Sequence, residues 1–280
     1  MELSKIKIIA DSSADIPEIS DIAFESVPLK IITAEKEYVD DKNLDVKQMV
    51  NELFSYNGKS STSCPNESDY LSAFGEAQYV FCITITATLS GSYNAAMMAK
   101  RTYEEEHPDR KVFILNSLST GPEMVLFIEK IKELALEGFE FEEVCSKLNE
   151  YSGKTGLIFM LESMKNLANN GRVSPLVAKM AGLLGIRVVG KASEVGDLQT
   201  LSKCRGEAKA LDYILETLKA EGLRSGKVII SHCFNKKAAF FLRELIHSKL
   251  PMANVKITTC SGLCSFYAEK GGMLVGFEKN

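Results

Sequence analysis

The sequence predicts a two-domain α/β protein, with an N-terminal α/β/α sandwich built on a parallel sheet and a C-terminal α/β domain built on a mixed sheet. Three observations carry this prediction. The 280 residues suffice for one large or two ordinary domains. In the first part of the chain, short runs rich in Ile and Val alternate with amphipathic stretches, which requires crossovers between parallel strands. Further along, strands are less regularly spaced and two long helical stretches stand among them.

The N-terminal domain contains four strand candidates separated by helical patterns. The strands are expected at KIKIIA (5–10), VPLKIIT (27–33), YVFCITIT (79–86) and KVFILN (111–116). Residues 44–56 repeat apolar side chains at three- and four-residue spacing, and residues 67–78 begin near Ser68, a candidate cap. Residues 121–138 open with a proline and close on a glycine, the asymmetry typical of a helix. Each of these three stretches predicts a scaffold helix.

The predicted strands become less regularly spaced after YSGKTG (151–156). We therefore expect the domain boundary there, giving domains 1–153 and 154–280. An apolar helical tract follows at 174–185. The later strand candidates are GLIFM, IRVVG, KVIISHCF, NVKITTC and MLVGFE, and the two long helix candidates are GEAKALDYILETLKAEG and KKAAFFLRELIHSK.

Composition places the chain among ordinary globular proteins, with 45% hydrophobic and 25% charged residues. No apolar stretch approaches the roughly 20 residues of a membrane span, and the N-terminus lacks the apolar core of a signal peptide. We therefore expect a cytoplasmic protein without a membrane span. The net charge of −4 offers no clustered basic surface, so we expect no nucleic-acid partner.

Seven cysteines, an odd number, lie mostly in apolar phrases, which favours reduced core thiols over a disulfide framework. Cys260 and Cys264 form a CxxxC pattern without a second pair, and the chain has only three histidines. We therefore expect no metal site.

Hydroxyl-bearing side chains follow the predicted strands of the first domain. The phrases are DSSADIP (11–17), ATLSGSYN (87–94), SLSTGP (117–122) and, from between two predicted helices, SSTSCP (60–65). Ligands of open parallel sheets collect outside the carboxyl ends of the strands, so we expect these clusters to converge. Ser90, Gly91 and Ser92 lie where a helix begins, an arrangement suited to binding an anion.

The anion expected at this edge is a single carboxylate. Neither GxxxxGK[ST] nor GxGxxG occurs, so we expect no nucleotide and no other cofactor. Lys59, at the margin of SSTSCP, is the only cation beside these phrases, which suits a monoanion better than a polyphosphate. Taken singly, each cluster is also explained as a cap or turn, because Ser, Thr and Asp are common at both.

An enzyme acting on a small carboxylate or phosphate at the same edge is the alternative. Nucleophilic catalysis needs a base beside the nucleophile, and only His232, at the end of a predicted strand, is placed to enter a site. The GxSxG elbow is missing. Asp11 or Cys260 would carry the chemistry in this alternative. Asp11 and Asp15 could also form a carboxylate pair for metal or acid–base chemistry, although a turn with a side-chain cap explains DSSADIP equally well.

An ordered set of phrases resembles the DegV family of bacterial two-domain proteins that bind fatty acids. The matching phrases are DSSADIP (11–17), STSCPNESDYLSAF (61–74), ITATLSGSYNAAMMA (85–99), NSLSTGPE (116–123), NLANNGRVS (166–174) and TTCSGLCSFYAEKGGMLVGFE (258–278). Each is weak alone, but together they cover essentially the whole chain in the family's order.

The resemblance implies a long-chain fatty acid held in a cleft between the two domains, with its carboxylate bound by hydroxyls. It also implies a non-enzymatic carrier that presents the acyl chain to a separate ATP-dependent fatty acid kinase. The residues that fall on the family's binding positions or beside them are Thr62, Ser61, Ser90, Gly91, Ser92, Arg172, Cys260 and Ser261. Leu176, Met180 and Leu184 of the apolar tract are candidates for lining the tunnel, although an ordinary helix core explains them equally well.

Two places depart from the family's pattern. Cys260 stands where the family usually carries a histidine, followed by Leu263 in place of proline and Cys264 in place of glycine. Cys64 replaces a glutamine and Asn66 a serine in the phrase that contains Thr62. A thiol is a weak hydrogen-bond donor and mostly neutral at pH 7. We therefore expect altered binding of the carboxylate or altered delivery of the fatty acid to the kinase. A different amphiphile as the ligand is the alternative.

Overall fold

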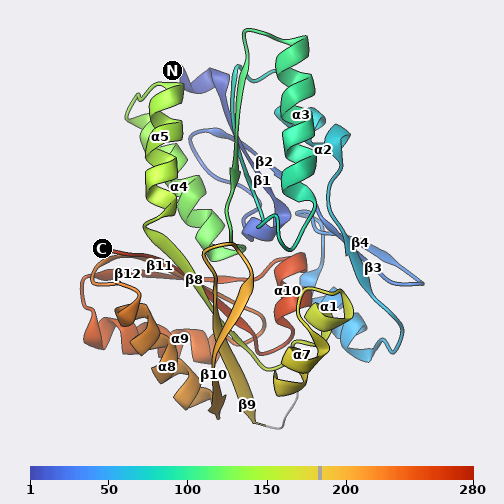
Figure 1. The fold of residues 1–280 in the computed structure, drawn as a ribbon, viewed down its shortest axis with the longest axis vertical. Coiled ribbons are helices and arrows are strands. Elements are labelled where there is room, and N and C mark those ends of the chain that lie inside the picture. Colours follow the sequence, from blue (N-terminus) through green and yellow to red (C-terminus); the bar gives the residue numbers. More distant parts are fainter. Residues whose placement is uncertain (182–184) are drawn as a thin grey trace.

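The computed structural model describes residues 1–181 and 185–280, and the side chains of Met180 and Ala181 are not described. A four-stranded parallel sheet and a separate six-stranded mixed sheet form its two main layers, which confirms the predicted class. Figure 1 shows the first sheet and its helices above the second. None of the helices within the described ranges has the length and apolar character needed to cross a membrane.

The first sheet has the order β2 (Ala23–Val27), β1 (Ile6–Asp11), β6 (Tyr79–Thr84) and β7 (Lys111–Asn116), and all its neighbours are parallel. Its two faces are covered by different helix pairs, as the alternation of side chains along a strand requires. One face packs on α4 (Pro122–Leu136) and α5 (Phe141–Ser152), and the other on α2 (Glu67–Phe74) and α3 (Ser92–Glu106).

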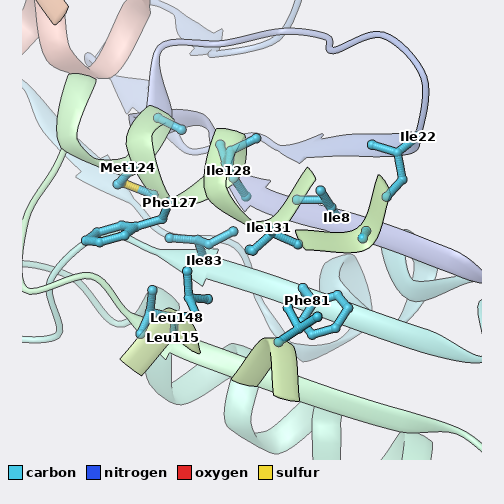
Figure 2. Packing of buried hydrophobic residues seen from close by; sticks show 14 of the residues in the cluster. Ile8, Ile22, Phe81, Ile83, Leu115, Met124, Phe127, Ile128, Ile131 and Leu148 are labelled. Atoms are coloured by element: carbon cyan, nitrogen blue, oxygen red, sulfur yellow. The ribbon is translucent and has the colours of Figure 1, made fainter. Parts of the chain in front are cut away.

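Alternate residues of the strands fill these two cores. Ile8, Phe81 and Ile83 meet Phe127 and Ile131 of α4, as Figure 2 shows. Their neighbours in the strands, among them Val80 and Cys82, pack on the opposite face. Burying each large aliphatic or aromatic side chain contributes roughly 1.5–3 kcal/mol, so these cores fix the positions of the strand ends.

A small antiparallel sheet lies beside this sandwich, with the order β4 (Glu37–Val39), β3 (Lys30–Ile32) and β5 (Ser61–Ser63). Helix α1 (Val46–Ser55) lies between β4 and β5 in the chain. The prediction of a single strand at 27–33 was wrong. Val27 ends β2, and β3 begins after Pro28, which cannot donate a hydrogen bond to a sheet.

The SSTSCP phrase lies between two helices, as predicted, and its residues Ser61–Ser63 form strand β5 where a cap or turn was the alternative. Thr62 lies opposite Ile31 in the β3–β5 pairing. After Pro65, helix α2 begins at Glu67 and is capped by Asn66, whose side chain accepts a hydrogen bond from the Asp69 amide at 3.1 Å. Ser68, the predicted cap, already lies inside the helix.

The second sheet has the order β10 (Leu198–Arg205), β9 (Ile186–Ala192), β8 (Thr155–Leu161), β13 (Met273–Glu278), β11 (Gly226–His232) and β12 (Ala253–Thr259). One face is covered by α8 (Glu207–Ala220) and α9 (Lys236–Lys249). The short helices α6 (Lys165–Asn169) and α7 (Pro175–Ala181) lie between β8 and β9 in the chain. Strand β10 was not predicted.

The passage from the first sheet to the second is short, because α5 ends at Ser152 and β8 begins at Thr155. We propose this passage as the boundary between domains 1–153 and 154–280, called below the first and second halves. Helix α10 (Gly262–Ala268), late in the second half, packs against α1 and β3 of the first, and Figure 1 shows it beside α1.

Two carboxylates of the first half hold the beginning of α10. Asp40 accepts hydrogen bonds from the amides of Gly262 at 2.7 Å and Leu263 at 2.9 Å. Asp15 accepts from the amide of Ser261 at 2.8 Å and from its hydroxyl at 2.6 Å. Unpaired amides and positive partial charge gather at a helix N-terminus, so both carboxylates stabilise this end.

Replacing Gly262 should disrupt the hydrogen bonds between Asp40 and the beginning of α10. A Cβ atom at Gly262 would lie 2.5 Å from Oδ1 of Asp40 and 2.6 Å from Cδ2 of Leu44. We expect Gly262→Ala to lower the free energy of unfolding by about 2–3 kcal/mol, measured by urea denaturation. Gly153→Ala is the matched control, since the nearest atom to its new Cβ would be 3.6 Å away. Equal losses in both variants would contradict the role given to Gly262.

Candidate functional site

A cavity of about 290 Å³ lies where the loops of the first half face the second sheet. Its floor is apolar and comes from β8, where Leu157, Phe159 and Leu161 project from the same face because alternate residues of a strand do so. Leu274, opposite Phe159 on β13, and Leu198 of β10 extend this floor. The face of the second sheet away from α8 and α9 is thus available to a hydrocarbon chain.

Hydroxyl groups form the opposite wall, and they come from three of the four phrases expected to converge. Thr62 and Ser63 belong to β5, Ser90 precedes α3, and Ser119 and Thr120 follow β7. The DSSADIP phrase lies behind this wall and supplies none of the described lining residues. The carboxyl ends of parallel strands therefore face the ligand space, as the sheet topology predicts.

Thr62 is paired with a residue that the sequence did not reveal. Its Oγ1 lies 2.7 Å from the hydroxyl of Tyr267, which α10 carries into the cavity. Burial raises the pKa of Tyr267, while the hydrogen bond with Thr62 and the positive charge of Arg172 oppose that rise. The phenol is therefore neutral at pH 7. Tyr267 lies within the matched terminal phrase, but nothing in that phrase links it to Thr62.

Ser90 and Gly91 stand at the beginning of α3, a helix of 15 residues. The Oγ atom of Ser90 is 3.0 Å from that of Ser92 and accepts from the Ser92 amide at 3.3 Å. A Cβ atom at Gly91 would lie 3.0 Å from Sγ of Cys64, so a side chain there would press on the loop after β5. The positive end of the dipole of α3 thus lies in the same wall of the cavity as Thr62.

Arg172 closes this end from the second half. Its Nε donates to the carbonyl of Leu89 at 3.1 Å, and Nη1 donates to the carbonyl of Asn170. Among the described residues that line the cavity, Arg172 is the only cation. Hydroxyls, a helix N-terminus and one guanidinium therefore gather at one end of an apolar space, which suits one carboxylate on a hydrocarbon chain.

Four of the eight candidate binding residues line the cavity: Thr62, Ser90, Gly91 and Arg172. Ser61 is exposed on the strand beside Thr62, and Ser92 is fully buried beneath Ser90. Leu176 is 76% exposed and is not among the lining residues.

Met180's side chain and the whole of Leu184 lie outside the described part of the chain, so the tunnel-lining prediction for them stays a prediction.

Cys260 and Ser261 lie apart from this cavity. They line a second hollow together with Asp15 and Asp40, on the side where α10 meets the first half. Burial raises the pKa of Cys260 well above its ordinary value, so the thiol is neutral. Its hydrogen-bonding neighbour is the hydroxyl of Ser231, 3.4 Å from Sγ. The departure from the family at Cys260 therefore falls at the junction of the halves, not beside Thr62.

The loop that carries Ser90 rests on Asp11, which is fully buried at the end of β1. Its carboxylate accepts from the amide of Ile85 at 2.8 Å and from the amide of Ser13 at 3.2 Å, as well as from the Ser13 hydroxyl. Burial raises the pKa of Asp11 to about 6, against the lowering effect of these donors. Asp11 therefore supports the site from behind and does not face the ligand space.

A family model described as "uncharacterised protein, DegV family" matches residues 5–280 of this chain. A DegV domain-containing protein of Streptococcus pneumoniae is 44% identical over 276 residues, which span 97% of this chain and 98% of that protein.

Two solved structures are similar in both sequence and fold. The Streptococcus pneumoniae Fatty Acid Kinase (Fak) B3 protein loaded with linoleic acid is 43% identical, with a TM-score of 0.97 over 98% of this chain and 99% of that one. A DegV family protein from Eubacterium eligens loaded with heptadecanoic acid is 40% identical, with a TM-score of 0.96 over 98% of this chain and 100% of that one.

The raised pKa of Asp11 predicts a pH-dependent stability. The folded chain holds this proton up to about pH 6, whereas a carboxyl at its ordinary value of 3.8 loses it earlier. Protonation of Asp11 therefore favours the folded state, and the free energy of unfolding falls as pH rises from about 4 to about 6. The shift from 3.8 to about 6 amounts to about 3 kcal/mol across this window.

Asp11→Asn should remove this share of the pH dependence, measured by urea denaturation at several pH values. Asp21→Asn is the control, because Asp21 is exposed and Lys132 lowers its pKa, so it contributes with the opposite sign. An unchanged slope between pH 4 and 6 in the Asp11 variant would show that this carboxyl does not titrate there.

Proposed function

Since the chain belongs to the DegV family, we propose that it binds one long-chain fatty acid in the cavity between the two halves. The carboxylate lies at Thr62, Ser90 and Arg172, and the hydrocarbon chain lies along the β8 face of the second sheet. The observation that carries this proposal is the division of one cavity into a hydroxyl-lined end with a single cation and an apolar floor.

The energetics favour an amphiphile with one negative charge. Each CH₂ group that leaves water contributes roughly 0.8 kcal/mol, so the floor of Leu157, Phe159 and Leu161 supplies most of the affinity. Removing a carboxylate from water is costly unless donors replace the water, and the hydroxyls at the polar end do so. The Fak B3 and Eubacterium eligens proteins, which carry linoleic and heptadecanoic acid, support this choice of ligand.

We propose a carrier and not an enzyme. Among the described residues that line the cavity, none is a histidine that would act as a base for Ser90 or Cys64. His232 ends β11 outside the lining, and burial lowers its pKa. All seven cysteines are free thiols, which supports a reducing compartment, and the cytoplasm is the location we propose.

The partner that we propose is an ATP-dependent fatty acid kinase, which accepts the bound acyl chain at its carboxylate. The name of the similar Fak B3 protein supports this assignment. The geometry supports it as well, because Cys64 and Gly91, beside the polar end, are both exposed. A head group held there lies close to the surface while its hydrocarbon chain remains buried.

Loss of the Thr62 hydroxyl should weaken binding without loss of fold. We expect Thr62→Val, which keeps the shape of the side chain, to raise the Kd for linoleic acid about tenfold, because a donor to a charged group is lost. The measurement is a fluorescence titration of delipidated protein. Ser61→Ala is the matched control, since the exposed neighbour does not line the cavity. Equal affinities for Thr62→Val and the unaltered protein would place the head group elsewhere.

Loading should control the contact with the kinase. We expect a tagged chain loaded with linoleic acid to retain a fatty acid kinase subunit in a pull-down, and a delipidated chain to retain at least fivefold less, as an order-of-magnitude expectation from about 1 kcal/mol of added contact. Capture that does not depend on loading would mean that the head group is not part of the interface.

A further inference from the structure

The β9–β10 hairpin forms one wall of the cavity. Its tip, residues 193–197, connects the two strands, and Ala192, Gly196, Asp197 and Leu198 line the ligand space. Figure 1 shows this hairpin rising from the second sheet toward the loops below β1 and α3. A segment of the second half thus covers a space whose opposite wall belongs to the first half.

The hairpin leaves the sheet before it reaches the first half. The pairing of β8 with β9 ends at Ile158 and Lys191, so Ala192 and the tip continue without support from β8. On the other side, β10 is the edge strand, and among the described residues it pairs only with β9. A two-stranded projection of this kind is marginally stable by itself, and it depends on what it touches.

The pairing of the two strands is irregular at the base of this projection. Gly190 of β9 is paired with Thr200 of β10, and the register shifts directly after this pair, between Thr200 and Ser202. A bulge leaves one residue unpaired and bends the strand. The ring of Phe159 packs on Gly190, because a Cβ atom there would lie 2.3 Å from Cζ of Phe159. Gly190 itself is held in the sheet by its pairing with Phe159, so the two strands are free to bend together only beyond Lys191, where β8 no longer supports them.

The tip keeps its shape through bonds of its own. The amide of Ser193 donates to the carbonyl of Asp197, and the amide of Gly196 donates to the carbonyl of Ser193, both at 2.9 Å. The hydroxyl oxygen of Ser193 also accepts from the amides of Val195 and Asp197. No internal bond of the tip needs to break when the tip moves as a unit.

Its attachment to the first half is small. Within the described ranges, the only hydrogen bond from the tip to the first half is donated by Oγ1 of Thr88 to the carbonyl of Gly196, at 2.9 Å. Gly196 is buried between exposed neighbours, and Val195 is 61% exposed. A Cβ atom at Gly196 would lie 2.0 Å from Oγ1 of Thr86, so only a glycine permits this close approach.

We infer that this hairpin is the movable wall through which the ligand enters and leaves. The inference rests on the proposed fatty-acid binding for its ligand, but the motion itself is a property of the empty chain. Lifting the tip from Thr86 and Thr88 breaks one hydrogen bond, bends the hairpin beyond Lys191 and opens the cavity beside Leu198. The contact between Thr88 and Gly196 therefore controls the rate of exchange.

Two buried cysteines allow this opening to be measured without ligand. Cys264 lines the cavity, whereas Cys260, four residues earlier, lines the second hollow. Delipidated protein is treated with N-ethylmaleimide, and the labelling of each cysteine is followed by peptide mass spectrometry. We expect Thr88→Val to raise the rate at Cys264 about fivefold, as loss of one hydrogen bond implies, and to leave Cys260 unchanged.

Two further variants test the same inference, one with a stronger expected effect and one as a control. Gly196→Ala forces the tip away from Thr86 and should raise the rate at Cys264 further, whereas Val195→Ala alters only an exposed side chain of the tip and should change nothing. Unchanged labelling of Cys264 in Thr88→Val overturns the inference. A parallel rise at Cys260 overturns it too, because it indicates general loosening.

Exchange of linoleic acid gives the second readout. If the ligand both enters and leaves past this hairpin, Thr88→Val accelerates loading and release by a similar factor, about fivefold. Because Kd is the ratio of the two rates, it then changes less than about twofold. Faster release with unchanged loading would mean that Thr88 merely stabilises the complex, against the inference. If the unaltered protein does not bind linoleic acid, the proposed function fails, and the labelling of Cys264 still decides the motion of the hairpin.

Discussion

Asp15 and Asp40 accept hydrogen bonds from Ser261, Gly262 and Leu263, and the placement of α10 against the first half depends on this contact. Burial raises the pKa of Asp15 to about 6 and raises that of Asp40, so holding both carboxylates away from water has a cost. The amides at the beginning of α10 offset that cost. Because α10 also carries Tyr267 and Cys264, the same contact fixes one side of the cavity.

The cavity exists only where the two halves meet, and each half supplies a different chemistry. The first half contributes hydroxyls at the ends of its strands, because parallel topology gathers those ends at one edge. The second half contributes an apolar sheet face, with Arg172 and Tyr267 at its polar end. A ligand that touches both halves stabilises their docking, since binding to the folded state alone shifts the unfolding equilibrium by mass action.

Local patterns in the sequence predicted what local physics determines. The apolar strands around Ile8 and Ile83 and the helix that begins at Pro122 followed from periodicity and caps. Strand β10 was missed because LQTLSKCR carries few apolar residues and lies at a sheet edge. The pairing of Thr62 with Tyr267 joins positions 205 residues apart, so no local pattern announces it. Cys260 was grouped with Thr62 because of the family resemblance, which gives no distances between residues. In the structure Cys260 lines the second hollow.

Native mass spectrometry of protein purified from cells tests the central claim most directly. The account predicts one long-chain fatty acid per chain, retained through purification and recovered as a free acid by solvent extraction. Tandem dissociation should release the ligand intact, because no bond joins it to the protein. A chain that is consistently empty, and that takes up no linoleic or heptadecanoic acid when either is supplied, would contradict the account.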